Sequence, residues 1–348
     1  MGSKARMLLF KMMKRAAVLS WVFLLIACEK DYEPVLSDNA LVKLDIPSYF
    51  PSWNGYAHEN KPTEYGVELG KRLFNDRRFS ADNSIACSSC HIQNYAFADD
   101  NVRAVGIKGR EGFRNVPPIQ NLLFMKFYNW DGNVLQLEKQ PLVPIITHEE
   151  MDSSVLEIIS RIKDDEVYKR LFTKVFGDAA VTADRIYRSI AQYEYTLISA
   201  GSKYDRVKKK EAVFTQDEER GYEVFQIKCI SCHNTALFTD QSFRNIGFPV
   251  NPDRNEAGRA RVTGLQEDYM SFRVPSLRNV EYTAPYGSFG QFATLKDVLD
   301  YFDAGVLDAA NLDPVFKNNG NRIPLTEQEK NDLISFMKTL SDNKFTGN

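Results

Sequence analysis

Apolar residues recur at helical spacing along much of the chain. Between positions 155 and 162 and between 186 and 197 they return every three or four residues, as they do on the buried face of an α-helix. Thr215 and Thr326 each precede a glutamate by three positions, and such capping boxes predict the starts of two further helices. The alternation that is typical of β-strands is scarce. The pattern predicts an all-α protein.

The N-terminus has the composition of an export signal. Residues 1–15 are basic, and residues 16–27 form an apolar run that is shorter than the roughly 20 residues of a bilayer-spanning helix. The run ends in Leu-Ile-Ala-Cys28, which resembles the bacterial lipobox, whose cysteine becomes the lipidated first residue of the mature protein. A signal without lipidation is the alternative. We expect a lipoprotein signal peptide over 1–27 and a periplasmic protein anchored to a membrane through Cys28.

The segment after the signal differs in composition from the rest of the chain. Residues 29–60 are rich in Asp, Pro, Ser and Asn and have no helical period, so we expect residues 28–60 to form a lipid-anchored tether. The whole chain is 43% hydrophobic and 26% charged, which excludes a disordered or low-complexity protein. Its net charge is −2 and its signal is basic, so the body is acidic and nucleic-acid binding is not expected.

Four of the five cysteines lie in two copies of one motif, C-x-x-C-H. The copies consist of Cys87, Cys90 and His91 and of Cys229, Cys232 and His233. This spacing is the attachment signature of c-type haem, because two thiols bond to one porphyrin while the adjacent histidine reaches the iron. A zinc site built from both motifs and a pair of disulfides are the alternatives, although zinc sites rarely place histidine directly after the second cysteine. The motifs predict two covalently bound haem c groups.

The two motifs lie 142 residues apart, and the segments around them are similar. The first motif follows the sequence ELGKRLF at 68–74, and the second follows ERGYEVF at 219–225. Such a repeat indicates two copies of one domain. We expect two cytochrome-c-like domains related by duplication, one over 61–205 and one over 206–348, with a solvated basic linker at 203–210.

At these motifs the sequence resembles the bacterial di-haem cytochrome c peroxidase family, including its MauG-like branch. The resemblance runs from about residue 61 to residue 345. Outside the haem motifs, the matching segments are residues 114–117, 130–132, 137–140, 149–151, 273–280 and 283–286. Their order and spacing distinguish this family from other cytochromes with two haem motifs.

The resemblance implies a role for each matching residue. The haem on His91 corresponds to the peroxidatic haem, and the haem on His233 to the electron-transferring haem. Trp130 matches the tryptophan that relays electrons between them, although a core aromatic is the alternative from the residue alone. Gln140 and Glu150 match the pair over the first haem, where the amide orients peroxide and the carboxylate moves a proton between its oxygens.

The resemblance also implies a calcium site and reveals two departures from the family pattern. Asn115, Thr283 and Pro285 match the calcium ligands, and calcium suits such a set of oxygen atoms. Many members block the first iron with a histidine, but Ile107 stands at that position and cannot bind iron. We therefore expect a first haem that needs no reductive unlocking. His148, two residues before Glu150, either touches the pocket or is a surface histidine.

The second departure concerns the sixth ligand of the second haem. The family places Met there, or Tyr in MauG-like members, but the alignment reaches Phe302. Tyr301 beside it is a candidate ligand after a small shift, and water or no ligand is the alternative.

Three functions follow from the resemblance. The first is reduction of hydrogen peroxide to water with electrons from a small periplasmic cytochrome or copper protein. The second is a MauG-like oxidase that modifies a protein or a small molecule, and the third is a non-catalytic electron-transfer lipoprotein. Gln140 and Glu150 favour an enzyme, because an electron carrier needs no pocket that handles protons. A homodimer is left open.

Overall fold

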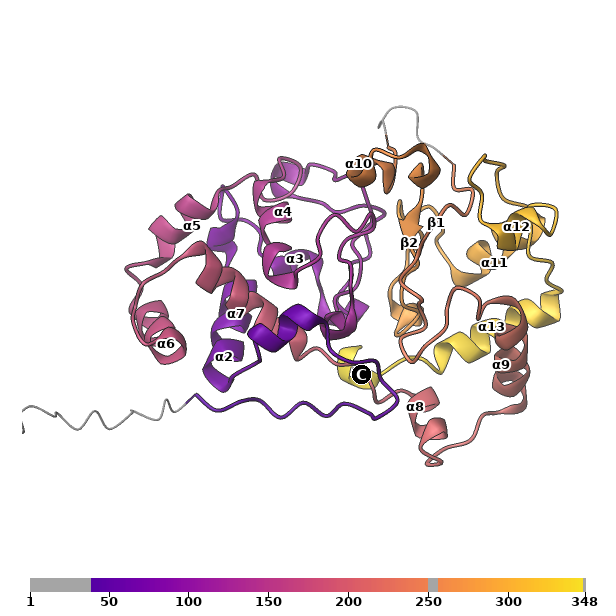
Figure 1. The fold of residues 1–348 in the computed structure, drawn as a ribbon, viewed down its shortest axis with the longest axis horizontal. Coiled ribbons are helices and arrows are strands. Elements are labelled where there is room, and N and C mark those ends of the chain that lie inside the picture. Colours follow the sequence, from indigo (N-terminus) through magenta and orange to yellow (C-terminus); the bar gives the residue numbers. More distant parts are fainter. Residues whose placement is uncertain (1–38, 250–255, 347–348) are drawn as a thin grey trace, which may run out of the picture. The chain divides into compact units, whose positions relative to one another are not determined.

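A computed structural model describes residues 39–249 and 256–346, and this part of the chain is mostly helical, as predicted (Figure 1). The helices up to residue 195 are α2 (Glu64–Phe74), α3 (Cys87–Cys90), α4 (Leu142–Ile146), α5 (Val155–Ile162), α6 (Glu166–Phe176) and α7 (Ala183–Tyr195). The helices that follow are α8 (Lys203–Lys208), α9 (Gln216–Lys228), α10 (Ala260–Thr263), α11 (Leu295–Ala304), α12 (Pro314–Lys317) and α13 (Glu327–Lys338). Short 3-10 turns connect many of them.

The four helices expected from the sequence pattern are all present. The two periodic segments form α5 and α7. Thr215 and Thr326 cap α9 and α13, and each hydroxyl accepts a hydrogen bond from the backbone N–H three residues on. The only sheet among the described residues has two short strands, β1 (Phe243–Arg244) and β2 (Phe272–Arg273), which pair antiparallel with Phe243 opposite Arg273.

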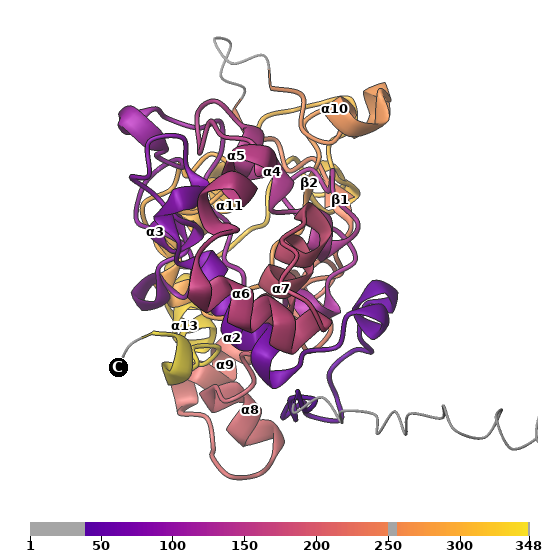
Figure 2. The ribbon, with the colours of Figure 1, turned by 90° about the vertical axis from the view of Figure 1, so that its left-hand side faces the viewer.

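The repeat around the two haem motifs corresponds to two equivalent helix pairs. In the first, α2 packs against α7, as both ribbon views show (Figures 1 and 2). A Cβ on Gly70 of α2 would lie 1.8 Å from the carbonyl oxygen of Ser189, so only glycine allows this approach. In the second pair, a Cβ on Gly221 of α9 would lie 1.9 Å from the carbonyl oxygen of Asp332 of α13. The glycine shared by the repeated sequences therefore serves the same packing contact twice.

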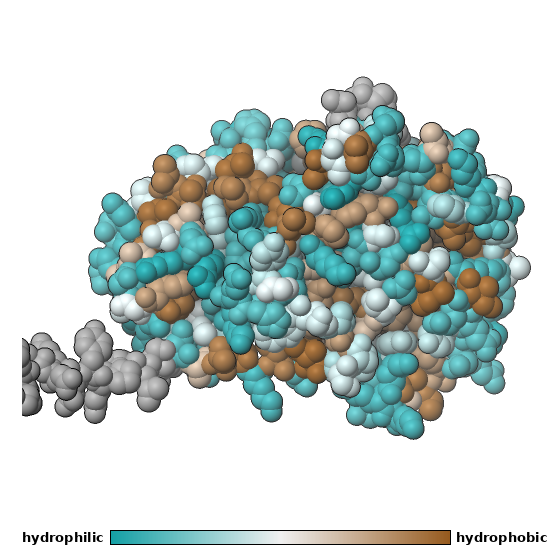
Figure 3. Space-filling view, viewed as in Figure 1, coloured by the Kyte–Doolittle hydropathy of each residue, from teal (hydrophilic) through white to brown (hydrophobic). Residues whose placement is uncertain are grey.

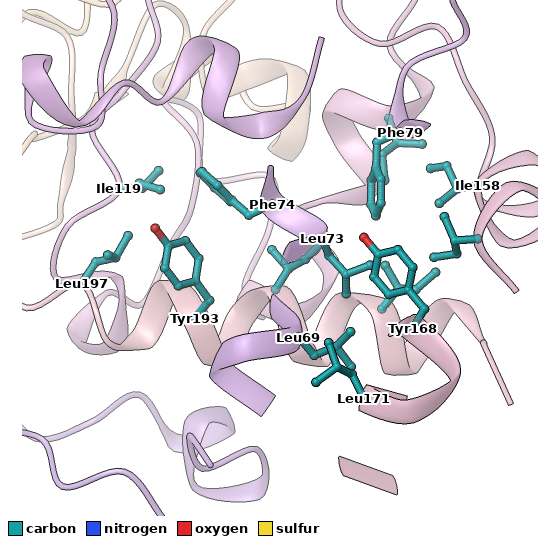
Figure 4. Close-up of a cluster of buried hydrophobic side chains, with 14 of the residues drawn as sticks. Leu69, Leu73, Phe74, Phe79, Ile119, Ile158, Tyr168, Leu171, Tyr193 and Leu197 are labelled. Atoms are coloured by element: carbon teal, nitrogen blue, oxygen red, sulfur yellow. The ribbon is translucent and has the colours of Figure 1, made fainter. Parts of the chain in front are cut away.

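Each helix pair carries its own core. In Figure 4, side chains from α2, α6 and α7 meet in the first core. Its fully buried members include Leu69, Leu73, Phe74, Tyr168 and Phe172. The second core lies on α9 and α13 and is rich in aromatic rings, among them Phe225, Phe238 and Phe336. On the face shown in Figure 3, hydrophilic residues predominate and hydrophobic residues lie in small groups.

The described part of the predicted tether differs from that expectation. Residues 39–60 pack against the body, with Phe50 and Ala57 buried in a core that also contains Phe124. The Tyr49 hydroxyl donates a hydrogen bond to Asp205 at 2.8 Å. Aromatic residues within an otherwise polar segment thus attach it to the body. The signal peptide, Cys28 and the segment up to residue 38 lie outside the described residues.

The basic segment 203–210 is also more ordered than a solvated linker. Its first six residues form α8, whose start is capped by Ser202. Asp205 of this helix forms an ion pair with Arg278 at 2.9 Å, and both side chains are fully buried. Basic side chains of the segment, including Arg206 and Lys208, remain exposed, as predicted. Among the helices of the described residues, none is long and apolar enough to cross a membrane.

Candidate active site

The first C-x-x-C-H motif presents two thiols and one imidazole at the edge of a cavity. α3 consists of the segment Cys87–Cys90, so the two thiols lie one helical turn apart. The ring Nδ1 of His91 lies 2.9 Å from the carbonyl oxygen of Phe97. When Nδ1–H donates to this carbonyl, Nε2 is the nitrogen left to bind a metal. Burial lowers the pKa of His91 and so favours the neutral ring that a metal ligand requires.

The second motif has the same local geometry. Cys229 follows α9 directly, and the backbone N–H of His233 donates to the Cys229 carbonyl at 3.0 Å. Nδ1 of His233 lies 2.9 Å from the carbonyl oxygen of Phe238, and burial again lowers the pKa of the ring. Both motifs therefore hold a neutral imidazole in a fixed orientation beside two thiols.

These residues fit covalently bound haem. The thiols of Cys87, Cys90, Cys229 and Cys232 are free, so the disulfides considered as an alternative are not formed. Among the described residues, no group of three or more His, Cys, Asp and Glu side chains is placed to hold a metal ion, so the zinc alternative is not formed either. Free thiols beside an imidazole with one open nitrogen match the donor set of a c-type haem.

The first motif opens into a cavity of about 480 Å³. Cys87, Cys90 and His91 line it together with Phe74 of α2. The predicted residues Trp130, Gln140 and Glu150 line the same cavity. Residues up to 76 positions apart in the sequence, from Phe74 to Glu150, are thus brought to one site, although their roles in catalysis stay predictions.

Glu150 lies in the turn after α4, in a position that depends on a close backbone contact. The backbone N–H of Ile107 donates to the Glu150 carbonyl at 2.9 Å. A Cβ on Gly106 would lie 2.1 Å from the carbonyl oxygen of Glu149, so this approach requires glycine. Burial, and then the charge of Glu149, raise the pKa of Glu150 to about 7. The carboxyl group can therefore gain or lose a proton near neutral pH.

Gln140 and Trp130 are fixed by hydrogen bonds to residues that precede Trp130 in the sequence and to the other half of the chain. The amide nitrogen of Gln140 donates to Oδ1 of Asn129 at 3.2 Å. The indole N–H of Trp130 donates to the carbonyl oxygen of Asn115 at 2.9 Å. The Trp130 carbonyl accepts from the backbone N–H of Arg273 at 2.8 Å. Trp130 is thus held between the first half of the chain and β2.

The two residues considered near the first iron, Ile107 and His148, lie away from the cavity. Ile107 is buried in the protein, and its neighbours Val105 and Gly106 line the cavity instead. The His148 side chain is 64% exposed and its Nδ1 lies 3.2 Å from Asp152. His148 is therefore a surface histidine.

Tyr301, the candidate ligand of the second haem, uses its hydroxyl in backbone contacts. The hydroxyl donates to the Gly247 carbonyl at 2.5 Å and accepts from the Leu307 N–H at 3.4 Å. Phe302 packs against Phe316, with ring centroids 5.2 Å apart. Ligation by Tyr301 would require the Gly247 hydrogen bond to break, and this assignment stays a prediction.

The predicted calcium ligands lie in a region where two segments of the chain are hydrogen bonded. The Asn115 side-chain amide donates to the Asn101 carbonyl at 3.1 Å, and its backbone N–H donates to the Ser288 carbonyl at 3.0 Å. Ser288 follows Thr283 and Pro285 closely in the sequence. Calcium binding stays a prediction.

The structure adds two cavity residues that the sequence did not reveal, Glu194 and Arg273. Oε2 of Glu194 is buried without a hydrogen-bond partner. Burial, and then the charge of Glu138, raise the pKa of Glu194 to about 8. The available signal was its spacing on α7, because Ile186, Ile190 and Glu194 follow one another every four residues. A carboxylate in an apolar stripe indicates a buried polar site.

Comparisons with known proteins agree with this geometry. The family model of the di-haem cytochrome c peroxidases matches residues 64–213. The methylamine utilization protein MauG of Methylophilus methylotrophus is 31% identical over 78% of this chain and 81% of its own length. The cytochrome c551 peroxidase of Nitrosomonas europaea is 34% identical over 79% of each chain.

A solved structure extends this agreement to three dimensions. The crystal structure of a MauG-like protein associated with microbial copper homeostasis superposes with a TM-score of 0.78 and 30% identity, over 86% of this chain and 96% of that protein. The diheme peroxidase BthA of Burkholderia thailandensis shares the fold at 21% identity, with a TM-score of 0.72. With two haem motifs, one open cavity and relatives of this similarity, the chain belongs to the di-haem cytochrome c peroxidase family.

Proposed function

We propose that the protein reduces hydrogen peroxide to water at the first haem, with electrons delivered through the second. The observation that carries this proposal is the single cavity that joins His91, Gln140, Glu150 and Trp130. The reaction consumes one peroxide, two electrons and two protons and yields two waters. When bound, each haem supplies an iron that changes its redox state, and the first supplies an open coordination position.

The side chains of the cavity divide the remaining tasks. Glu150 takes a proton from one peroxide oxygen and returns it to the other, which its pKa of about 7 permits near neutral pH. The Gln140 amide, held by Asn129, orients peroxide by hydrogen bonds. This division of tasks argues against a non-catalytic electron carrier, which would need neither side chain.

Trp130 lies on the route between the two motifs. Its carbonyl accepts a hydrogen bond from the backbone N–H of Arg273 of β2. The backbone of Pro275, two residues further on, lies beside His233 and acts to raise the pKa of that ring. We therefore assign Trp130 to electron transfer from the second haem to the first. The donor to the second haem is a small periplasmic cytochrome or copper protein.

The proposal also includes the location and the remaining sites. The protein is exported to the periplasm and held at a membrane through lipidated Cys28. Asn115, Thr283 and Pro285 bind calcium, the latter two through backbone carbonyls, because their oxygen atoms suit this ion. Mass spectrometry of the mature N-terminus and calcium analysis of the purified protein test these two assignments.

A MauG-like oxidase is the second candidate, and Ile107 favours it. Because no histidine stands at this position to block the first iron, the fully oxidised protein would react with peroxide without prior reduction. Steady-state peroxide consumption with a reduced donor supports the peroxidase. Peroxide-dependent modification of a protein or small molecule, without donor turnover, supports the oxidase.

The experiment common to both candidates is an optical titration of the fully oxidised, haem-loaded protein with cyanide and with peroxide. We expect both ligands to change the spectrum of one haem at once. A protein that responds only after one-electron reduction would contradict the open site, and a protein with fewer than two haems would contradict the function itself.

A further inference from the structure

Among the described residues, three arginines line the cavity of the first motif, and only one of the three is buried without a carboxylate partner. Arg114 is neutralised by Asp131 at 2.8 Å and Glu256 at 3.0 Å. Arg261 is exposed and stacks on Phe113. Arg273 is 8% exposed and forms no ion pair with any described residue.

The contacts of Arg273 do not compensate its charge. Its Nε donates to the Asn129 carbonyl and its Nη1 to the Val274 carbonyl, each at the long distance of 3.4 Å. Burial lowers the pKa of Arg273 to about 10, so the group is still charged at neutral pH. A buried charge without a counter-ion is strongly unfavourable. The group that fills the cavity must therefore supply an anion.

We propose that Arg273 binds a propionate carboxylate of the haem attached at Cys87 and Cys90. This inference rests on the proposed function, because it requires that haem. Haem carries two propionates, and a guanidinium group pairs with a carboxylate through two parallel hydrogen bonds. Since Arg114 is already paired and Arg261 is exposed, Arg273 is the buried cation of the described cavity lining that is available for this contact.

The position of Arg273 gives the contact a consequence for the whole site. Arg273 belongs to β2, so a residue of the second half holds the haem of the first. Its backbone N–H binds the Trp130 carbonyl, and its side chain binds the backbone of Asn129, whose amide oxygen holds Gln140. Arg273 is thus a positioning residue for the haem edge, the tryptophan and the glutamine together.

The test compares Arg273→Gln with Arg273→Lys and with Arg259→Gln in the haem-loaded protein. Arg259 is a matched control, since its Nη1 donates to the Asp131 and Gly132 carbonyls at 2.8 and 3.1 Å, but it does not line the cavity. The measurement is the reduction potential of each haem by optical redox titration. The first haem is identified as the one that binds cyanide.

We expect Arg273→Gln to lower the reduction potential of the first haem by at least about 59 mV, which is a tenfold shift of the one-electron equilibrium toward the oxidised form. Loss of the cation leaves the propionate charge uncompensated and disfavours the added electron. Arg273→Lys should keep the potential of the first haem close to its wild-type value, and Arg259→Gln should leave it unchanged. A first-haem potential that is the same in Arg273→Gln as in the wild type, or as strongly shifted in Arg259→Gln, would overturn the inference.

If Arg273→Gln does not fold, Arg273→Lys tests the proposed contact with the propionate. Resonance Raman bands of the propionate groups should shift in this variant, because an ammonium group cannot form two parallel hydrogen bonds. Unchanged bands in an Arg273→Lys protein that still carries both haems would overturn the inference. Loss of a haem from the wild-type protein would instead contradict the proposed function.

Discussion

The two haem motifs share one local geometry but lie in different surroundings. In both, the imidazole Nδ1 lies 2.9 Å from a backbone carbonyl five or six residues further along the chain. The first motif faces a cavity that contains Gln140 and Glu150. The second packs against an aromatic core in which Phe225 and Phe336 have ring centroids 5.0 Å apart. The motif therefore determines how haem is attached, and the surroundings determine what the haem can do.

The difference is one of proton chemistry. Beside the first motif lie carboxyl groups whose pKa values burial raises toward neutrality, Glu150 to about 7 and Glu194 to about 8. Such groups exchange protons at physiological pH, which reduction of peroxide requires. The core beside the second motif consists of hydrocarbon and aromatic side chains, and the charged groups near His233, Asp240 and Arg244, form an ion pair with each other, which suits a centre that only stores and passes electrons. A duplicated domain has thus been specialised through its neighbouring residues.

The strongest test of this comparison removes the thiols of one motif at a time. We expect Cys87→Ala/Cys90→Ala and Cys229→Ala/Cys232→Ala each to lose one covalent haem and to abolish peroxide turnover. Only the second variant should still bind cyanide, because only it keeps the haem at the open cavity. Pyridine haemochrome assays and intact mass measure the haem content. Cyanide binding that survives in the first variant would reverse the assignment of the two motifs.

Much of this comparison could be predicted from the sequence, because its signals are local. The motifs, the capping boxes at Thr215 and Thr326 and the helical periods each lie within a few residues, where covalent and helical geometry dictate the outcome. The roles of Gln140 and Glu150 could be predicted only from the family resemblance, because the local sequence does not distinguish a buried carboxylate in a polar turn from an exposed one.

The features that sequence reasoning missed depend on pairs of distant residues. The burial of Asp205 follows from Arg278, 73 positions away, and no local pattern distinguishes it from the exposed charges around it. The same holds for Tyr49, whose hydrogen bond to Asp205 helps attach a segment that resembles a linker in composition. Arg273 is a further case, because its lack of a carboxylate partner is visible only in three dimensions.

A second test addresses the proton chemistry of the first cavity. We expect Glu150→Gln to lower kcat/KM for peroxide by about 10²–10⁴-fold, the usual contribution of a positioned acid–base group. The change keeps the shape of the side chain but removes its ability to accept a proton. Haem content and cyanide affinity should remain those of the wild type. Glu68→Gln, at an exposed carboxylate of α2, is the matched control.

A third, smaller effect is the pH dependence of the reaction. Since Glu150 acts first as a base, kcat/KM should rise about tenfold per pH unit below its pKa of about 7 and level off above it. Glu149 contributes to that raised pKa through its charge. Glu149→Gln should therefore move the midpoint to lower pH. A midpoint that does not move, or that moves upward, would show that another group controls the profile.

The smallest expected effect concerns the second motif. Tyr301→Phe removes a hydroxyl that donates to the Gly247 carbonyl, so we expect a loss of about 0.5–1.5 kcal/mol in the free energy of unfolding. The optical spectrum of the second haem should stay unchanged as long as this hydrogen bond holds the hydroxyl. Disappearance of a tyrosinate charge-transfer band in the variant would instead identify Tyr301 as a ligand. In that event the second centre, too, would have a polar group at its iron, and the contrast between the two motifs would be smaller than the packing of their surroundings indicates.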